Sequence, residues 1–220
     1  MSDPSLQVPA RFHDPTYERP VRSRYVDPVE VIWLAAARRL GITLRRDATV
    51  FSMTDGLGTL WLSTREHLDA DDCLAQMMFH ELCHWVTNGR EVVTERDWGF
   101  PLYDLEDVRE HGCLRLQAWW AGQHGLRDMM GPTGQYRQYY DQLPEDALAA
   151  LDDGPWDRAV RACADQAVER AQTDPWWAPI DAALAATAAT RAVLKPFLDD
   201  YQSEDAEDVL PLLWAGEPQG

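Results

Sequence analysis

The stretch FHELCHW, residues 79–85, places His80 and His84 four residues apart, with Glu81 directly after the first histidine. In an α-helix, positions i and i+4 lie on one face about a turn apart, so both imidazoles can bind one ion. A catalytic zinc ion takes three protein ligands and a water molecule, whose pKa the ion lowers to about 7. Glu81 is then expected to act as the general base for this water. The sequence therefore predicts a metal site with two ligands and a base on one helix. The alternative, that both histidines are hydrogen-bonded core residues, is disfavoured by the glutamate between them.

The third protein ligand must come from another part of the chain. The helical pattern LEDVREHGCLRLQAWWAGQHG, residues 105–125, offers Glu106, Glu110 and His111. We favour Glu110, because a loop followed by a helix can bring it back against the first helix. Spacing alone does not choose among neighbouring helix positions, so His111 and Glu106 stay open as the third ligand. If Glu110 is the ligand, Glu106 is an ordinary solvated residue, and His111 orients a ligand or packs in the core.

Other side chains are candidates for supporting roles. The donor that stabilises a tetrahedral intermediate is sought among Tyr136, Tyr139, Tyr140 and His124, although aromatic residues at helical spacing more often belong to a core. Asp97 either orients a metal-bound imidazole or forms a turn. Cys113, one turn after Glu110, should face the first helix near Cys83, and all four cysteines are expected to be free thiols because no CxxC spacing occurs.

The composition indicates a folded and strongly acidic protein. Hydrophobic residues make up 45% of the chain, and 20 basic residues stand against 37 acidic ones, which gives a net charge of -17. A field of this sign repels nucleic-acid backbones and anionic membrane surfaces, so neither is an expected partner. A peptide or protein substrate is expected instead. The first residues do not form a secretory signal, and no apolar run approaches the ~20 residues of a membrane span, so we expect a cytoplasmic protein.

Capping signals, turn residues and apolar periodicity predict an α+β fold in three parts. Residues 1–27, rich in proline and charge, are expected to form an extended N-terminal arm. Residues 28–135 are expected to form the metal-binding catalytic domain, and residues 136–220 a C-terminal helical extension with an acidic tail. Predicted helices cover 28–40, 68–88, 105–125, 156–172 and 176–197, and predicted strands lie within 42–53 and 58–64, as a hairpin or as neighbours. Helical spacing predicts a buried face on the motif helix, formed by Leu74, Met77, Met78 and Leu82.

Over about residues 57–111 the chain resembles the zincin metallopeptidases of the HExxH-plus-Glu type. The likeness rests on the strand GTLWLST, the HExxH helix after it and a glutamate on a later helix. It implies a zincin-like small sheet packed on the active-site helix, with zinc bound by His80, His84 and Glu110 and with Glu81 as the base. It also implies that the strand before the helix lines the cleft and pairs with an extended substrate.

A second resemblance, over about residues 50–125, is to the bacterial elongation factor P hydroxylases. It rests on TLWLS, on HELCHW followed by Gly89, on DWGF at residues 97–100, and on REHGCLRLQAWWAG. It implies an iron ion held by His80, His84 and Glu110, with open positions for oxygen. Those enzymes act on a modified lysine of an acidic translation factor, which a chain of charge -17 would repel, so the substrate is not carried over.

The sequence thus predicts a zinc-dependent, metallopeptidase-like hydrolase first and an iron-dependent hydroxylase second. In the hydrolase Glu81 is a base, whereas in the hydroxylase it only positions other groups. A third hypothesis is a scaffold that a closed metal site stabilises. Its mark would be a fourth protein ligand, such as His111 beside Glu110.

Overall fold

The computed structural model describes residues 16–18, 20, 26–68, 72–100 and 107–198. Within them the chain forms six α-helices and a small mixed sheet, which confirms the predicted α+β class. Almost all of the predicted N-terminal arm, the acidic tail and Glu106 lie outside the described residues. None of the described helices combines the length and the apolar character that crossing a membrane requires.

Helix α1 (Pro28–Arg39) begins where its capping signals predict. The carboxylate of Asp27 accepts a hydrogen bond from the N–H of Val29 at 2.8 Å, and Pro28 occupies the first helical position. The chain leaves the helix through Gly41, whose φ of 78° favours glycine.

The sheet has the order β1-β3-β2, with β1 (Thr43–Arg46), β2 (Ser52–Thr54) and β3 (Thr59–Leu62). β3 runs parallel to β1 and antiparallel to β2, so the predicted hairpin forms between β2 and β3. The stretch expected as one strand over 42–53 divides in two, because Asp47 accepts a hydrogen bond from the N–H of Thr49 at 2.8 Å and turns the chain. The middle strand is therefore β3, and β2 is an edge.

Helix α2 (Leu74–Asn88) carries the HExxH motif and is the most enclosed element of the fold. Every residue of α2 except His80 is buried, including the predicted apolar face. The helix begins six residues later than expected from residue 68, because the chain is extended at Leu68 and again at Cys73, the N-cap. The acidic residues that were expected in the first turn therefore precede the helix. It ends at Gly89, as predicted.

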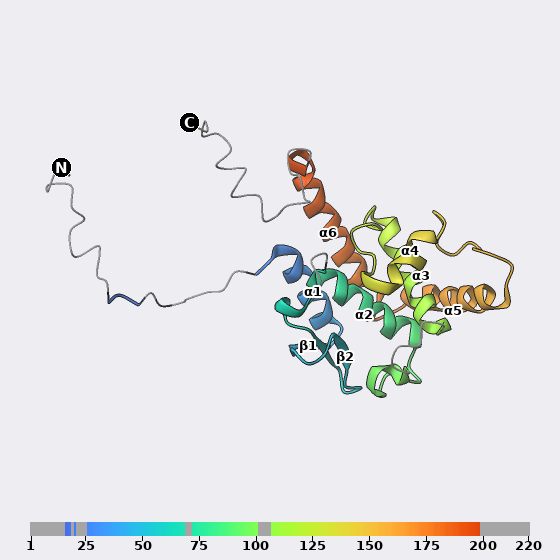
Figure 1. Cartoon of the computed structure of the whole chain (residues 1–220), viewed down its shortest axis with the longest axis horizontal. Helices are drawn as coiled ribbons and strands as arrows, with labels where there is room; N and C mark the ends of the chain where they lie inside the picture. The colour runs from blue at the N-terminus through green and yellow to red at the C-terminus, as the bar shows by residue number, and fades with distance from the viewer. Residues whose placement is uncertain (1–15, 19, 21–25, 69–71, 101–106, 199–220) are drawn as a thin grey trace, which may run out of the picture.

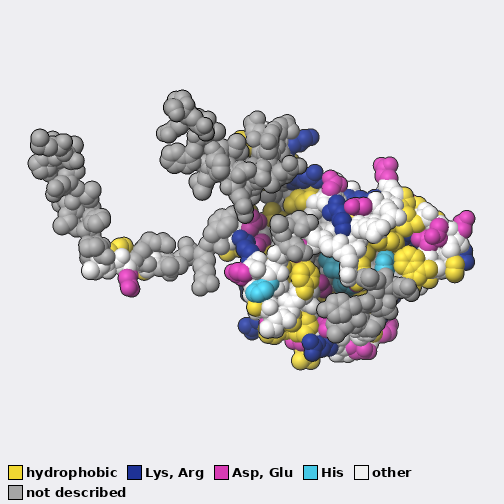
Figure 2. Space-filling view, viewed as in Figure 1, with side chains coloured by type: hydrophobic (Ala, Val, Ile, Leu, Met, Phe, Trp, Pro, Cys, Tyr) yellow, Lys and Arg dark blue, Asp and Glu magenta, His cyan; other side chains and the backbone are white. Residues whose placement is uncertain are grey.

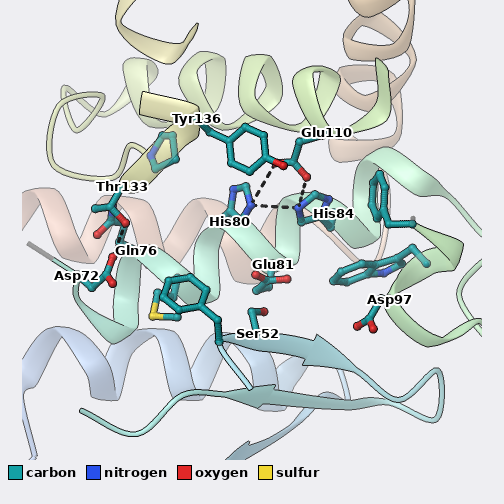
Figure 3. A pocket seen from close by; sticks show the side chains of 15 residues that line it. Ser52, Asp72, Gln76, His80, Glu81, His84, Asp97, Glu110, Thr133 and Tyr136 are labelled. Atoms are coloured by element: carbon teal, nitrogen blue, oxygen red, sulfur yellow. Dashed lines mark hydrogen bonds and ion pairs between the residues drawn. The ribbon is translucent and has the colours of Figure 1, made fainter. Parts of the chain in front are cut away.

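α3 (Val108–Gln123) contacts α2, α4 (Arg137–Gln142) and α5 (Pro155–Ala171). α1 and α5 also contact α2, and α6 (Trp177–Leu198) contacts α1 (Figure 1). α3 and the sheet lie on opposite sides of α2 (Figure 3). One apolar cluster joins α1, β3, α2, α3, α5 and α6, through residues that include Trp33, Leu60, Phe79, Trp120, Ala167 and Leu184. Helices α5 and α6 of the predicted extension thus share the core of the motif helix, and the boundary at residue 136 stays a prediction.

Gly112 allows α3 and α5 to approach closely. A Cβ atom at this position would lie 2.7 Å from Sγ and 3.0 Å from Cβ of Cys163. Both distances are shorter than van der Waals contact. The position of α3, and with it that of Glu110, thus depends on the absence of a side chain at Gly112.

We expect Gly112→Ala to destabilise the protein by about 1–3 kcal/mol, because the new methyl group overlaps α5. Gly122→Ala is the matched control, since it lies in the same helix with nothing within 4 Å of its Cβ position. It should stabilise the protein by about 0.5–1 kcal/mol through helix propensity alone. Urea unfolding of both variants measures the difference, and a stabilised Gly112→Ala variant would contradict the close approach.

Candidate metal centre

Ligand atoms of three side chains converge between α2 and α3 (Figure 3). The two Nε2 atoms of His80 and His84 are 3.0 Å apart, Oε1 of Glu110 lies 3.6 Å from Nε2 of His80, and Oε2 lies 3.3 Å from Nε2 of His84. Two bonds of about 2.1 Å to one ion place their ligand atoms about 3.4 Å apart at a tetrahedral angle and about 3.0 Å apart at a right angle. The three separations therefore fit a single metal ion.

The burial of Glu110 also fits an ion. Oε1 of Glu110 is buried and has no hydrogen-bond partner among the described residues, and the same is true of Nδ1 of His84, the ring nitrogen that does not face Glu110. An unpaired buried polar atom costs about 1–3 kcal/mol, so such atoms are uncommon in folded proteins. Coordination to a cation would compensate the carboxylate oxygen.

The start of α3 is fixed so that Glu110 faces α2. Asp107 caps the helix by accepting a hydrogen bond from the N–H of Arg109 at 2.7 Å. The Arg109 guanidinium donates to the carbonyl of Trp98 at 3.1 Å and lies 4.2 Å from the ring centre of Phe100. Since Trp98 and Phe100 line the same pocket as Glu110, Arg109 ties the helix start to the opposite wall.

Burial sets the protonation of the ligands. It lowers the pKa of His84 well below its ordinary value, and the nearby His80 and Arg109 act in the same direction. His84 is therefore neutral and needs to lose no proton before it binds an ion. Burial raises the pKa of Glu110 to about 7, with His80 opposing the shift and Glu81 and Asp107 adding to it. In the metal-free protein this carboxyl is therefore half protonated near neutral pH.

Glu81 lies where the sequence predicted a base. Its side chain sits below and between the two imidazoles, above Ser52 of β2, and lines the same pocket (Figure 3). Burial raises its pKa, while His80 and the Ser52 hydroxyl oppose the shift. A raised pKa makes this carboxylate a better proton acceptor than an exposed one.

His84 is oriented by aromatic rings. Trp98 stacks on it with the ring centres 4.9 Å apart, and Phe100 meets it edge-on at 5.2 Å. The stack depends on the turn η4 (Arg96–Gly99), in which Asp97 and Trp98 have φ values of 50° and 52°. Asp97 does not orient an imidazole, contrary to one expectation, because its Oδ1 accepts a hydrogen bond from the N–H of Thr54 at 2.9 Å. It fastens this left-handed turn to β2.

His80 is oriented by Gln117, a residue that the sequence analysis missed. Oε1 of Gln117 lies 3.0 Å from Nδ1 of His80. Gln117 follows Glu110 by about two turns of α3 and so lies on the same helix face. That spacing is the signal that could have identified it.

His111 does not join the site, because its ring points to the other side of α3. It meets the rings of Tyr139 and Trp156 at 4.5 and 4.8 Å, and its Nδ1 lies 2.9 Å from the carbonyl oxygen of Asp107. Of the residues proposed as the third ligand, Glu110 is thus brought to the histidines and His111 is not.

Of the expected proton donors, Tyr136 lines the pocket. Tyr139 accepts a hydrogen bond from the buried Arg115 at 2.7 Å, Tyr140 donates to the carbonyl of Arg127 at 3.0 Å, and His124 pairs with Asp181 at 2.8 Å. These three side chains are therefore engaged elsewhere.

Cys113 is a second metal-ligand candidate near the histidines. One ligand atom each from His80, His84 and Cys113 lie within 4.8 Å of one another. The Cys113 thiol is fully buried, burial raises its pKa well above the usual range, and Sγ donates to the carbonyl of His80 at 3.7 Å. It does not line the pocket, whereas Glu110 does. Glu110 therefore fits a third ligand position that is open to the pocket, and Cys113 does not.

The pocket beside the histidines has a volume of about 280 Å³. His80, His84, Glu81 and Glu110 lie at one end, Asp72, Gln76 and Thr133 lie at the other, and Phe51, Met77, Trp98 and Phe100 give it apolar walls (Figure 3). The side chain of His80 is 18% exposed, so the centre is open to solvent. Figure 2 shows a histidine at the bottom of a hollow in the middle of the face turned toward the viewer.

Comparison of the chain with models of protein families, with curated protein sequences and with solved structures gave no match.

The buried carboxyl of Glu110 predicts a pH-dependent stability for the metal-free protein. Its pKa is about 7 in the folded chain against an ordinary value of 4.5, so the folded state binds the extra proton between these values and loses stability as the pH rises from 4.5 to 7. One pKa unit corresponds to about 1.4 kcal/mol, so the free energy of unfolding falls by about 3 kcal/mol over this pH range. Glu110→Gln lacks this loss, and should therefore match the wild type at pH 5 and exceed it by about 3 kcal/mol at pH 8.

Urea unfolding after dialysis against a chelator measures this difference at both pH values. Parallel pH profiles for the wild type and Glu110→Gln would contradict a buried, ionising Glu110.

Proposed function

We propose that the protein is a zinc-dependent hydrolase of the metallopeptidase type. The observation that carries this proposal is the arrangement of the ligand atoms of His80, His84 and Glu110 around one point, with Glu81 facing the same pocket. Zinc in such a site polarises a carbonyl group and lowers the pKa of water. A mixed sheet, an HExxH helix and a later helix that bears a glutamate also form the layout of the zincin-like fold.

In this proposal Glu81 transfers a proton from the water to the leaving amine. It accepts a proton from the water that adds to the carbonyl carbon, and it donates that proton to the amine nitrogen when the C–N bond breaks. The raised pKa of Glu81 suits both steps. Tyr136 faces the centre from the opposite wall and is the candidate donor to the oxygen that gains negative charge (Figure 3).

An extended peptide is the substrate that the edge of the sheet favours. The N–H of Ser63, in the segment after β3, donates to the carbonyl of Phe51 at 2.8 Å. Because backbone groups alternate in direction along an antiparallel strand, the N–H and C=O of the next residue, Ser52, point away from β3 toward the open edge. Phe51 and Ser52 line the pocket. β3 is paired on both sides, so the strand directly before the helix is not available to a substrate. We assign that role to β2.

An iron-dependent hydroxylase is the second candidate. Two histidines and one carboxylate that leave positions open are also the donor set of non-haem iron oxygenases. The likeness to elongation factor P hydroxylases adds to this alternative. The scaffold hypothesis is weaker, because His111, its expected fourth ligand, faces Tyr139 and Trp156.

Metal content and hydrolysis test the proposal together. We expect about one zinc per chain in protein purified without added metal or a nickel column, its loss in Glu110→Ala, and its retention in His111→Ala and Cys113→Ser. Glu81→Gln should retain zinc and cleave a peptide library about 10²–10⁴ times more slowly than the wild type.

The alternatives give different results in the same experiments. Iron in place of zinc, with oxygen consumption that Glu81→Gln lowers only slightly, would replace the hydrolase by the hydroxylase. Absence of metal from every preparation would contradict both.

A further inference from the structure

The amide of Gln117 lies between a metal ligand and the wall of the pocket. Gln117 is fully buried in α3. Its Nε2 donates to the carbonyl of Met130 at 2.6 Å, and its Oε1 lies 3.0 Å from Nδ1 of His80. Both ends of one side chain are thus engaged.

These contacts determine where the proton of His80 resides. A carbonyl oxygen only accepts hydrogen bonds, so the NH₂ group of Gln117 must face Met130 and its oxygen must face His80. The amide oxygen is also only an acceptor, so Nδ1 of His80 must carry the proton. In a neutral imidazole Nε2 then has a free electron pair, which points toward Glu110 and His84.

A second glutamine holds the same segment, and among the described residues it has no hydrogen bond to a histidine ring. Nε2 of Gln76, on α2, donates to the carbonyl of Gly131, the residue after Met130. The hydroxyl of Thr133 donates to the carboxylate of Asp72. Residues 130–133 are therefore fixed to both α2 and α3, and they lead directly into η5 (Gly134–Tyr136), which carries Tyr136 to the pocket.

We propose that Gln117 is a positioning residue of the metal centre, which holds His80 in the tautomer that binds metal and ties its ring to the segment 130–133 that walls the pocket. This inference rests on the metal centre of the proposed function. Gln76 holds the segment 130–133 but forms no hydrogen bond with His80, so it serves as the structural control.

Zinc affinity separates the two glutamines. Gln117→Met removes both hydrogen bonds at similar volume, and we expect zinc to bind 10–100 times more weakly, as measured by competition with a chelator of known affinity. Gln76→Met should lose stability but keep the zinc dissociation constant within about threefold. Gln117→Glu keeps an acceptor for the proton on Nδ1 but loses the donor to Met130, so it should bind zinc more tightly than Gln117→Met does. Unchanged affinity in Gln117→Met, or an equal loss in Gln76→Met, would overturn the inference.

A second readout needs neither metal nor activity. In metal-free wild-type protein at pH 8.5, nitrogen NMR of labelled histidine should show His80 protonated at Nδ1 and not at Nε2. In Gln117→Met this preference should disappear. Protonation of wild-type His80 at Nε2 would overturn the inference even if zinc binds. A wild type that has the expected tautomer but binds no metal would refute the proposed function and leave the orienting role of Gln117 intact.

Discussion

The helix at the centre of the molecule has no solvated face, yet it carries two histidines and a glutamate. Because α2 is covered by α1, α3, α5 and the turn η4, polar atoms of the motif that do not face the pocket depend on partners inside the protein. A buried polar atom left without a partner costs about 1–3 kcal/mol. Gln117 and Glu110 therefore support the motif from α3, and the pocket leaves His80 partly exposed to solvent.

Helix α3 supplies most of these partners, and its own position is determined by packing. Gly112 brings it against α5, and its buried Arg115 pairs with Asp157 of α5 at 2.5 Å. The same burial that orients Glu110 raises its pKa, so the metal-free protein holds a carboxylate in a costly environment. An arrangement that is unfavourable without a ligand and complementary to a cation is typical of a functional site rather than of a stabilising one.

Local signals predicted much of this fold. Asp27 and Gly89 mark helix ends, and the spacing of the apolar residues in α2 identifies its buried face. The i, i+4 spacing of the histidines is also visible in the sequence, whereas spacing left Glu110, His111 and Glu106 open as the third ligand. Of the two that the structure describes, Glu110 lies beside the histidines and His111 does not. The features that were missed depend on contacts between distant segments: the late start of α2, the position of β2 at the sheet edge, the Trp98 stack on a left-handed turn, and the contact between Gln117 and His80. No periodicity within one segment encodes them.

X-ray absorption at the metal edge tests the central claim most directly, because it reports both the element and the atoms bound to it. The protein should be purified without added metal and without an affinity tag that binds metal. We predict zinc surrounded only by nitrogen and oxygen atoms at about 2.0–2.2 Å, with the scattering pattern of two imidazoles. A sulfur neighbour at about 2.3 Å would place Cys113 in the position assigned to Glu110 and contradict this account, as would the absence of a bound metal.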